Sequence, residues 1–118
     1  MARPTAFKKD GFRRVRGGNS RWLLVHCEKC QTPVLVYQKD GPGMLKRLYV
    51  DRIVAPRSLA DLQNLSIKRL PNLVCAQCKT ILGVPYVYEK EQRSAFRLFV
   101  GAVGKKIVKG EKVEDIRV

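Results

Sequence analysis

Acidic residues are scarce in this 118-residue chain, with 10 Asp and Glu against 24 Lys and Arg and a formal net charge of +14. The chain also has one histidine, and its apolar stretches are only a few residues long. No segment is therefore expected to span a membrane. A lone histidine and the lack of GxSxG, Walker-type or dinucleotide motifs argue against an enzyme. We expect no catalytic residues and no small-molecule substrate.

Signals of export are also missing, because the N-terminus has no apolar signal-peptide core. We expect a cytoplasmic protein, in whose reducing environment cysteines stay thiols. The basic, acid-poor N-terminus leaves an organellar transit peptide open, although it has little serine and no clear amphipathic helix. The length suits one small domain with a thin core, in which a metal crosslink offsets some chain entropy.

All four cysteines belong to two C-x2-C pairs with 44 residues between them: Cys27, Cys30, Cys75 and Cys78. Four thiolates delivered in this way suit one tetrahedral structural Zn²⁺ ion, and they leave no open coordination position for catalysis. Iron and iron–sulfur clusters also accept four cysteines, so iron stays open. Two disulfides or a thioredoxin-like redox pair are weaker interpretations, because nothing indicates export and no βαβ pattern surrounds either pair.

The two cysteine pairs, which we call hooks, have similar surroundings. A threonine follows the second cysteine of each hook by two positions, at Thr32 and Thr80. This similarity suggests two knuckle-plus-hairpin units that share one ion. His26 directly precedes Cys27, but adjacent side chains rarely reach one ion with good geometry, so we expect a strand residue or an RNA contact.

The remaining pattern predicts a mainly β protein, with a small α+β fold as a variant. Runs of β-forming residues predict strands over 21–26, 31–37, 44–50, 84–88 and 95–103. The turn at 39–43 predicts a hairpin between the second and third of these strands, and a charged turn is expected at 90–93. A short helix is expected near 58–65, with Ser58 as its N-cap. Phe96, Leu98 and Val100 would share one face of the last strand, and Trp22, Tyr49 and Phe96 are expected in the core.

We expect three regions: a disordered basic arm over 1–21, a zinc-binding β domain over 22–103, and a basic tail over 104–118. The arm has a net charge of +6, three glycines and no helical or strand period. Its Phe7 and Phe12 could stack on bases or wedge into a partner, or touch nothing.

A basic protein of this size is expected to bind a polyanion, most concretely RNA of the ribosome, alongside neighbouring ribosomal proteins. Cations and aromatics on one sheet face suit RNA backbone and exposed bases. The candidate contacts are Arg3, Lys8, Lys9, Arg13, Arg14, Arg16, Arg21, Lys46, Arg47, Lys68, Arg69, Lys105 and Lys106. The alternatives are a module that binds an acidic protein, a DNA-binding zinc protein of transcription or repair, and a merely solvated basic surface.

Two C-x2-C hooks at this separation, each leading into strands, resemble the zinc-stabilised β-tent folds over residues 21–103. That group includes methionine sulfoxide reductase B and the Yippee-like domains. The resemblance implies that Cys27, Cys30, Cys75 and Cys78 bind one zinc at one end of two packed sheets. The reductase also needs a fifth, catalytic cysteine, which this chain lacks. The basic arm and hooks also resemble small zinc-ribbon ribosomal proteins.

Overall fold

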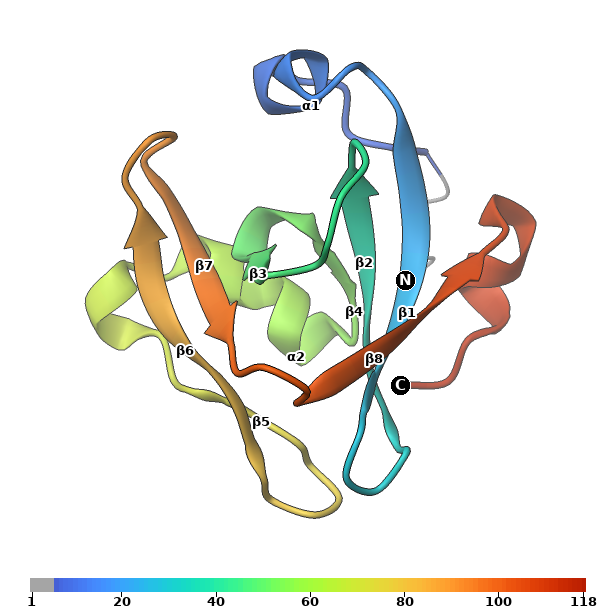
Figure 1. The fold of residues 1–118 in the computed structure, drawn as a ribbon, viewed down its shortest axis with the longest axis vertical. Helices are drawn as coiled ribbons and strands as arrows, with labels where there is room; N and C mark the ends of the chain where they lie inside the picture. Colours follow the sequence, from blue (N-terminus) through green and yellow to red (C-terminus); the bar gives the residue numbers. More distant parts are fainter. Residues whose placement is uncertain (1–5) are drawn as a thin grey trace.

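The computed structural model describes residues 6–118, which form two four-stranded antiparallel sheets. In the first sheet the strands lie in the order β4 (Ile53–Ala55), β2 (Pro33–Asp40), β1 (Ser20–Cys27) and β8 (Val103–Val108). In the second sheet the order is β3 (Arg47–Tyr49), β7 (Arg93–Leu98), β6 (Ile81–Tyr88) and β5 (Leu73–Val74). Figure 1 shows the two sheets side by side. The predicted mainly β fold is confirmed.

Helical structure is confined to short segments that connect or flank the strands. They are α1 (Gly11–Val15), α2 (Arg57–Ala60) and the 3-10 turns η1 (Val50–Arg52), η2 (Asp61–Asn64), η3 (Ile67–Arg69) and η4 (Gly110–Asp115). The helix predicted near 58–65 is therefore α2 followed by η2, and its N-cap is Pro56 rather than Ser58. No helix of residues 6–118 has the length and apolar character needed to cross a membrane.

The main core lies between the sheets and follows from side-chain alternation along the strands. On β1, Leu23 and Val25 are buried in this core, and Leu35 of β2 joins them. The second sheet contributes Leu48 and Phe96, which pair directly across β3 and β7. Each such side chain contributes about 1.5–3 kcal/mol through burial. The predicted core positions Trp22, Tyr49 and Phe96 are all buried.

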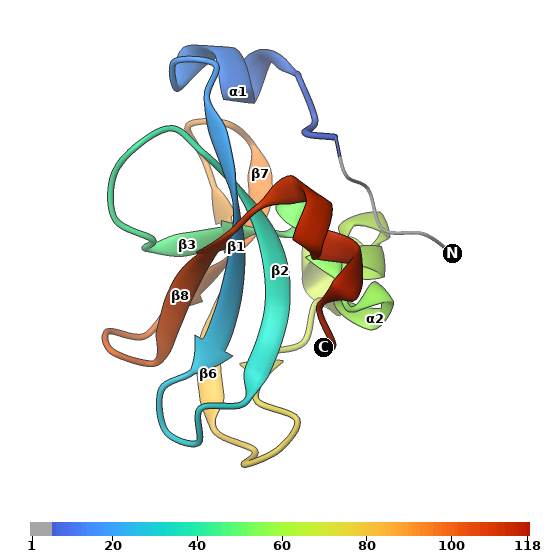
Figure 2. The ribbon, with the colours of Figure 1, turned by 90° about the vertical axis from the view of Figure 1, so that its right-hand side faces the viewer.

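A second apolar cluster covers the outer face of the first sheet. Trp22 and Val36 point to this face and pack with Val113 of η4, while Phe7 of the N-terminal segment packs against the same cluster. Figure 2 shows η4, in red, lying over β1 and β2. Residues 104–118 were expected to form a tail; instead they complete β8 and cover this face, because the first sheet has apolar side chains on both of its faces.

The predicted hairpin between 31–37 and 44–50 is wrong. The chain does turn after β2, where Gly41 and Gly43 have positive φ angles of 72° and 108°. Both edges of β2 are already paired, however, with β1 on one side and β4 on the other. The chain therefore continues to the second sheet, where β3 is only three residues long.

The strand predicted over 95–103 is also divided between the sheets. β7 ends at Leu98, a turn containing Gly101 at φ 75° reverses the chain, and β8 then pairs with β1. Val100 lies in this turn and is fully exposed, so it does not share a buried face with Phe96. The charged turn predicted at 90–93 is present between β6 and β7.

Candidate metal centre and nucleic-acid interface

Each cysteine hook forms the turn between two antiparallel strands. The first hook joins β1 to β2 and the second joins β5 to β6. In both, the amide of the first cysteine donates to the carbonyl of the threonine beyond the hook, at 2.9 Å for Cys27 to Thr32 and 2.9 Å for Cys75 to Thr80. The two strand–hook–strand units are thus built with the same hydrogen bonds, as the sequence similarity suggested.

The residue after each hook adopts the left-handed conformation, with φ 63° at Gln31 and 64° at Lys79. Their amides donate back to Cys27 and Cys75 carbonyls at 2.7 and 2.8 Å, which closes the turn. Their side chains then donate to the carbonyl three residues earlier, each at 2.8 Å. These bonds offset part of the strain of a left-handed residue that is not glycine.

The four sulfurs gather within 4.8 Å of one another. Two close contacts join one hook to the other, with 3.7 Å from Cys27 Sγ to Cys78 Sγ and 3.6 Å from Cys30 Sγ to Cys75 Sγ. A tetrahedron with metal–sulfur bonds of about 2.3 Å has sulfur–sulfur edges of about 3.8 Å. The cysteines therefore fit one tetrahedral metal ion, which would connect the first sheet to the second.

Two threonine hydroxyls lie beside the more accessible sulfurs, with Oγ1 of Thr32 3.2 Å from Cys30 Sγ and Oγ1 of Thr80 3.2 Å from Cys78 Sγ. The hydroxyl contact is the largest influence that lowers the pKa of Cys30, and it helps to lower that of Cys78 to about 6. A bond from the Cys30 amide lowers the pKa of Cys27, but burial and neighbouring sulfurs together raise it to about 11. The threonines thus favour the thiolates that a metal requires.

His26 lies outside the cysteine cluster, as expected. Its Nε2 is 2.7 Å from Oε1 of Glu28. Gly104 faces His26 across β1 and β8, and a Cβ there would meet both side chains.

The two small antiparallel sheets and the four cysteines define a small β protein with a cysteine cluster at metal-binding distance. No protein-family model, curated protein or solved structure matches the chain. The class of protein therefore rests on its own sheets and cysteines.

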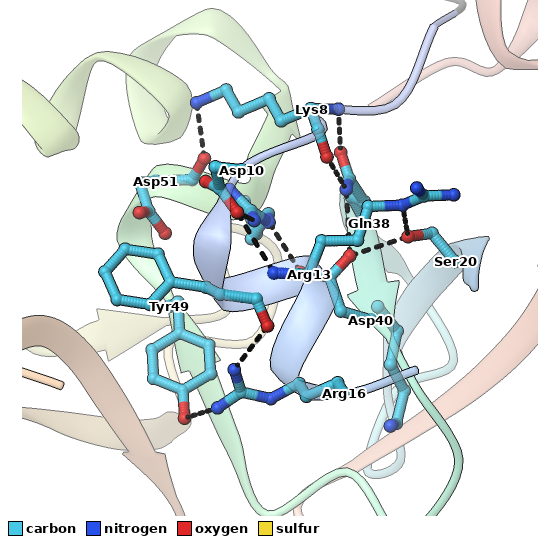
Figure 3. A network of polar contacts seen from close by, with 12 residues as sticks. Lys8, Asp10, Arg13, Arg16, Ser20, Gln38, Asp40, Tyr49 and Asp51 are labelled. Atoms are coloured by element: carbon cyan, nitrogen blue, oxygen red, sulfur yellow. Dashed lines mark hydrogen bonds and ion pairs between the residues drawn. The ribbon is translucent and has the colours of Figure 1, made fainter. Parts of the chain in front are cut away.

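Residues 6–21 of the N-terminal arm are built into the fold, which differs from the disorder expected for this part of the chain. Figure 3 shows the polar contacts of the arm residues Lys8, Asp10, Arg13 and Arg16. Asp10 caps α1 by accepting from the Arg13 amide at 3.1 Å. It also lies 2.6 Å from Nη2 of Arg52, whose Nε is 2.9 Å from Asp40. Burial of Arg52 with two carboxylates ties the arm to β2 and η1.

A second group of charges joins the arm to the second sheet. Both terminal nitrogens of Arg16 lie 2.8 Å from the Glu91 carboxylate, and one of them donates to the Tyr49 hydroxyl at 2.9 Å. Buried Arg93 pairs with Asp51 and Glu91 at 2.7 and 3.1 Å and stacks on the Tyr49 ring at 3.7 Å. Arg16 of the arm and Arg93 of β7 therefore share the Glu91 carboxylate, which anchors the arm to the second sheet.

We call the contacts that join residues 6–21 to the rest of the protein the arm network. Several predicted RNA contacts have partners within it. Lys8 donates to the Asp51 carbonyl at 2.6 Å, and Arg13 donates to Ser20 at 2.8 Å. The arm's aromatics are also engaged: Phe7 stacks on Trp22 at 4.6 Å, and Phe12 lies under the Arg93 guanidinium at 4.1 Å. Arg3, another predicted contact, lies outside the described residues.

The other predicted contacts separate into two groups. One group is exposed and lines none of the three hollows described below: Lys9, Arg14, Lys68, Arg69 and Lys106. In contrast, the structure brings together residues around loop 41–46, which we call the basic face: Arg16, Arg21, Lys39, Lys46, Arg47, Arg52, Arg97 and Lys105. Figure 2 shows this loop on the opposite side of the molecule from α2.

Three adjacent hollows, of about 230, 410 and 550 Å³, make up the basic face. Asp40 is the one carboxylate among their lining residues, and it is buried against Arg52. The pKa of Lys39 is lowered by burial first and then by the positive charges of Lys105 and Arg16. This crowding of like charges gives the basic face a positive electrostatic potential.

Sequence reasoning did not list Lys39, Met44, Tyr86 or Arg97 among its site residues. Lys39 belongs to the segment predicted as a turn. In the structure its Nζ donates to the carbonyls of Gly41 and Pro42 at 3.0 and 3.3 Å. Only the passage of the chain from β2 to β3 brings this turn beside β7. The repeated threonines, Thr32 and Thr80, were visible in the sequence and did mark residues of the metal centre.

Proposed function

We propose that this protein binds RNA without catalysing a reaction, that one Zn²⁺ ion stabilises its fold, and that it acts in the cytoplasm on ribosomal RNA, beside ribosomal proteins. The observation that carries the RNA proposal is the basic face, where eight cations line three adjacent hollows. Arg16 and Arg52 are paired with carboxylates, and the other six have no carboxylate partner among residues 6–118. Clustered cations bind nucleic-acid phosphates with release of the condensed counterions, which favours association.

The metal is proposed to be zinc because four cysteine thiolates in a tetrahedral arrangement are its common structural ligand set. Cys27 and Cys30 would hold it from the first sheet, and Cys75 and Cys78 from the second. Bound there, the ion supplies a crosslink, and with all four positions filled by sulfur it activates no water. Two sheets joined at one zinc also support the proposed β-tent architecture.

The arm network increases the positive charge left for a partner. Arg16, Arg52 and Arg93 are paired with four carboxylates, those of Asp10, Asp40, Asp51 and Glu91. The rest of the chain therefore carries 21 of the 24 cations and 6 of the 10 acids. A surface of this charge binds phosphates with an affinity that depends steeply on salt.

RNA is favoured over sequence-specific DNA because the described residues have no helix suited to a major groove. Among residues 6–118, the longest α-helix, α1, has five residues and the longest 3-10 turn, η4, has six. Helical DNA readers place several side chains of a longer helix on base edges. Irregular RNA instead offers splayed bases and phosphates to a sheet surface.

Fluorescence anisotropy with a labelled ribosomal RNA fragment, from about 50 to about 200 mM salt, tests the proposal. The double variant Lys46→Gln/Lys105→Gln removes two exposed cations of the basic face. Lys68→Gln/Arg69→Gln removes two exposed cations of η3 and is the matched control. We expect the first variant to reduce the slope of log K against log salt by about 2 and the control to leave it nearly unchanged.

A salt-insensitive complex, or equal losses in the two variants, would contradict RNA binding at the basic face. Displacement of the RNA by a polyglutamate peptide at equal charge concentration would indicate an acidic protein as the partner instead. Co-sedimentation with ribosomes in a density gradient, lost in the Lys46→Gln/Lys105→Gln variant, is the result expected for a ribosomal site.

A further inference from the structure

The largest hollow of the basic face differs from the other two because apolar side chains line it together with the cations. Exposed Met44 and Val100 and half-exposed Phe99 surround it, at the turn between β7 and β8 and the loop before β3. Exposed apolar groups gathered at one concave site typically mark a binding surface.

Two arginines stand opposite each other at this hollow. Arg47 of β3 and Arg97 of β7 are direct partners in the antiparallel register and both line it. Like charges in this relation repel each other. Neither has a carboxylate partner within residues 6–118. A bound anion between them would relieve this repulsion.

Tyrosine side chains hold both guanidinium groups in place. Nε of Arg47 donates to the Tyr86 hydroxyl at 2.7 Å, and its guanidinium lies 4.2 Å from the centre of the Tyr88 ring. The Arg97 guanidinium lies 4.6 Å from the centre of the Tyr86 ring. These contacts reduce the conformational entropy that the two arginine side chains lose on binding. Their remaining N–H groups stay available for phosphate oxygens.

We propose that this hollow binds an unpaired nucleotide of RNA, with its phosphate between Arg47 and Arg97 and its base against Phe99. The inference rests on the proposed function and adds the form of RNA that is bound. The hollow, at about 550 Å³, is within the roughly 300–1,000 Å³ of sites that hold whole small molecules. A base in a duplex is stacked and paired, so it cannot offer its face to Phe99.

The test compares two probes: a single-stranded RNA of about 12 nucleotides and the same sequence annealed into a blunt duplex. Phe99→Ala is expected to weaken single-strand binding by about 5- to 150-fold, with an unchanged salt slope and little effect on the duplex. Arg97→Gln is expected to reduce the salt slope by about 1. Ile81→Ala and Lys90→Gln, at exposed positions outside the hollow, are the matched controls and should bind as wild type.

Phe99→Trp keeps a stacking surface and should retain affinity, which separates loss of stacking from loss of folding. Equal wild-type affinity for duplex and single strand, or full affinity of Phe99→Ala for the single strand, would overturn the inference while RNA binding by the basic face stands. Failure of every RNA probe to bind would overturn both proposals.

Discussion

Arg52 and Asp40 form an ion pair in the interior, with Nε 2.9 Å from Oδ2 and side chains only 1% and 4% exposed. The arm supplies a second carboxylate, Asp10, 2.6 Å from Nη2. Nη1 of Arg52 is buried and has no hydrogen-bond partner among the described residues. A buried cation that depends on two carboxylates from distant segments makes the arm part of the folded domain.

Arg52→Met should destabilise the protein by about 3–5 kcal/mol, because it leaves the buried Asp40 carboxylate without its cation. Arg57→Met is the matched control, since Arg57 pairs with Asp61 in an exposed contact of 3.5 Å that contributes less than about 1 kcal/mol. Urea unfolding with excess zinc measures both. The pairing is less important than we infer if the two variants lose similar stability.

Asp10 should contribute a stability that is independent of pH near neutrality. The hydrogen bond from Arg52, as the largest cause, lowers its pKa from 3.8 to about 2. The unfolded state therefore binds the proton first as pH falls, and stability is lost only through this acidic window. Above about pH 5 the carboxylate is ionised in both states, so its contribution is constant.

Asp10→Asn removes the charge of Asp10 and keeps the cap of α1, because asparagine is also a good N-cap. We expect its cost in unfolding free energy to be equal from about pH 8 to about pH 5.5 and to shrink only below about pH 4. Urea titrations of both proteins at each pH measure the difference. A cost that already declines between about pH 8 and 5.5 would show that another group carries the effect.

The metal centre and the β class could be predicted because their signals are local. Two residues between cysteines determine the reach of each hook, and Thr32 and Thr80 repeat at the same offset. Alternation around Leu23 and Val25 identifies β1 with no knowledge of what packs on it.

The arm and the strand pairing could not be predicted in this way, because they depend on distant partners. Asp10 and Arg52 are 42 positions apart, and no local sequence pattern near either residue indicates the other as its partner. Leu48 pairs with Phe96 of β7 within the second sheet, although the turn between β2 and β3 resembles that of a local hairpin. The hollow beside Phe99 depends on the same crossover, so most of its residues were not recognised together.

Gly41 should be far less tolerant of substitution than Gly43 in the same loop. Both have positive φ, but a Cβ on Gly41 would lie 2.8 Å from the Arg16 carbonyl oxygen, whereas Gly43 has open space. Gly43→Ala should therefore cost about 1 kcal/mol from backbone strain, and Gly41→Ala about 1–3 kcal/mol more. Thermal unfolding of the two variants under one condition provides the comparison, and equal costs would mean that the close approach of the arm to this loop is easily relaxed.

Thr32→Val and Thr80→Val should weaken metal binding by similar factors of about 10, because each removes one hydroxyl beside one sulfur at the same distance. Competition with a chromophoric chelator measures the affinities. Thr80→Ser keeps the hydroxyl and should bind metal nearly as wild type. A weak Thr80→Ser variant would point to the methyl group and its packing instead of the hydroxyl.

Removal of the metal should unfold the protein, since sulfurs from both sheets would hold the ion. Structural zinc sites contribute about 10–16 kcal/mol of apparent binding free energy in small domains, more than the usual stability of a domain this size. We expect one zinc per chain by elemental analysis, none after EDTA or in Cys75→Ser, and a red shift of Trp22 emission as its buried ring meets water. Ala76→Ser, at an exposed position of the same hook, should keep the metal, and added zinc should restore the EDTA-treated protein. A metal-free protein with an unchanged melting temperature would refute a structural role for the four cysteines.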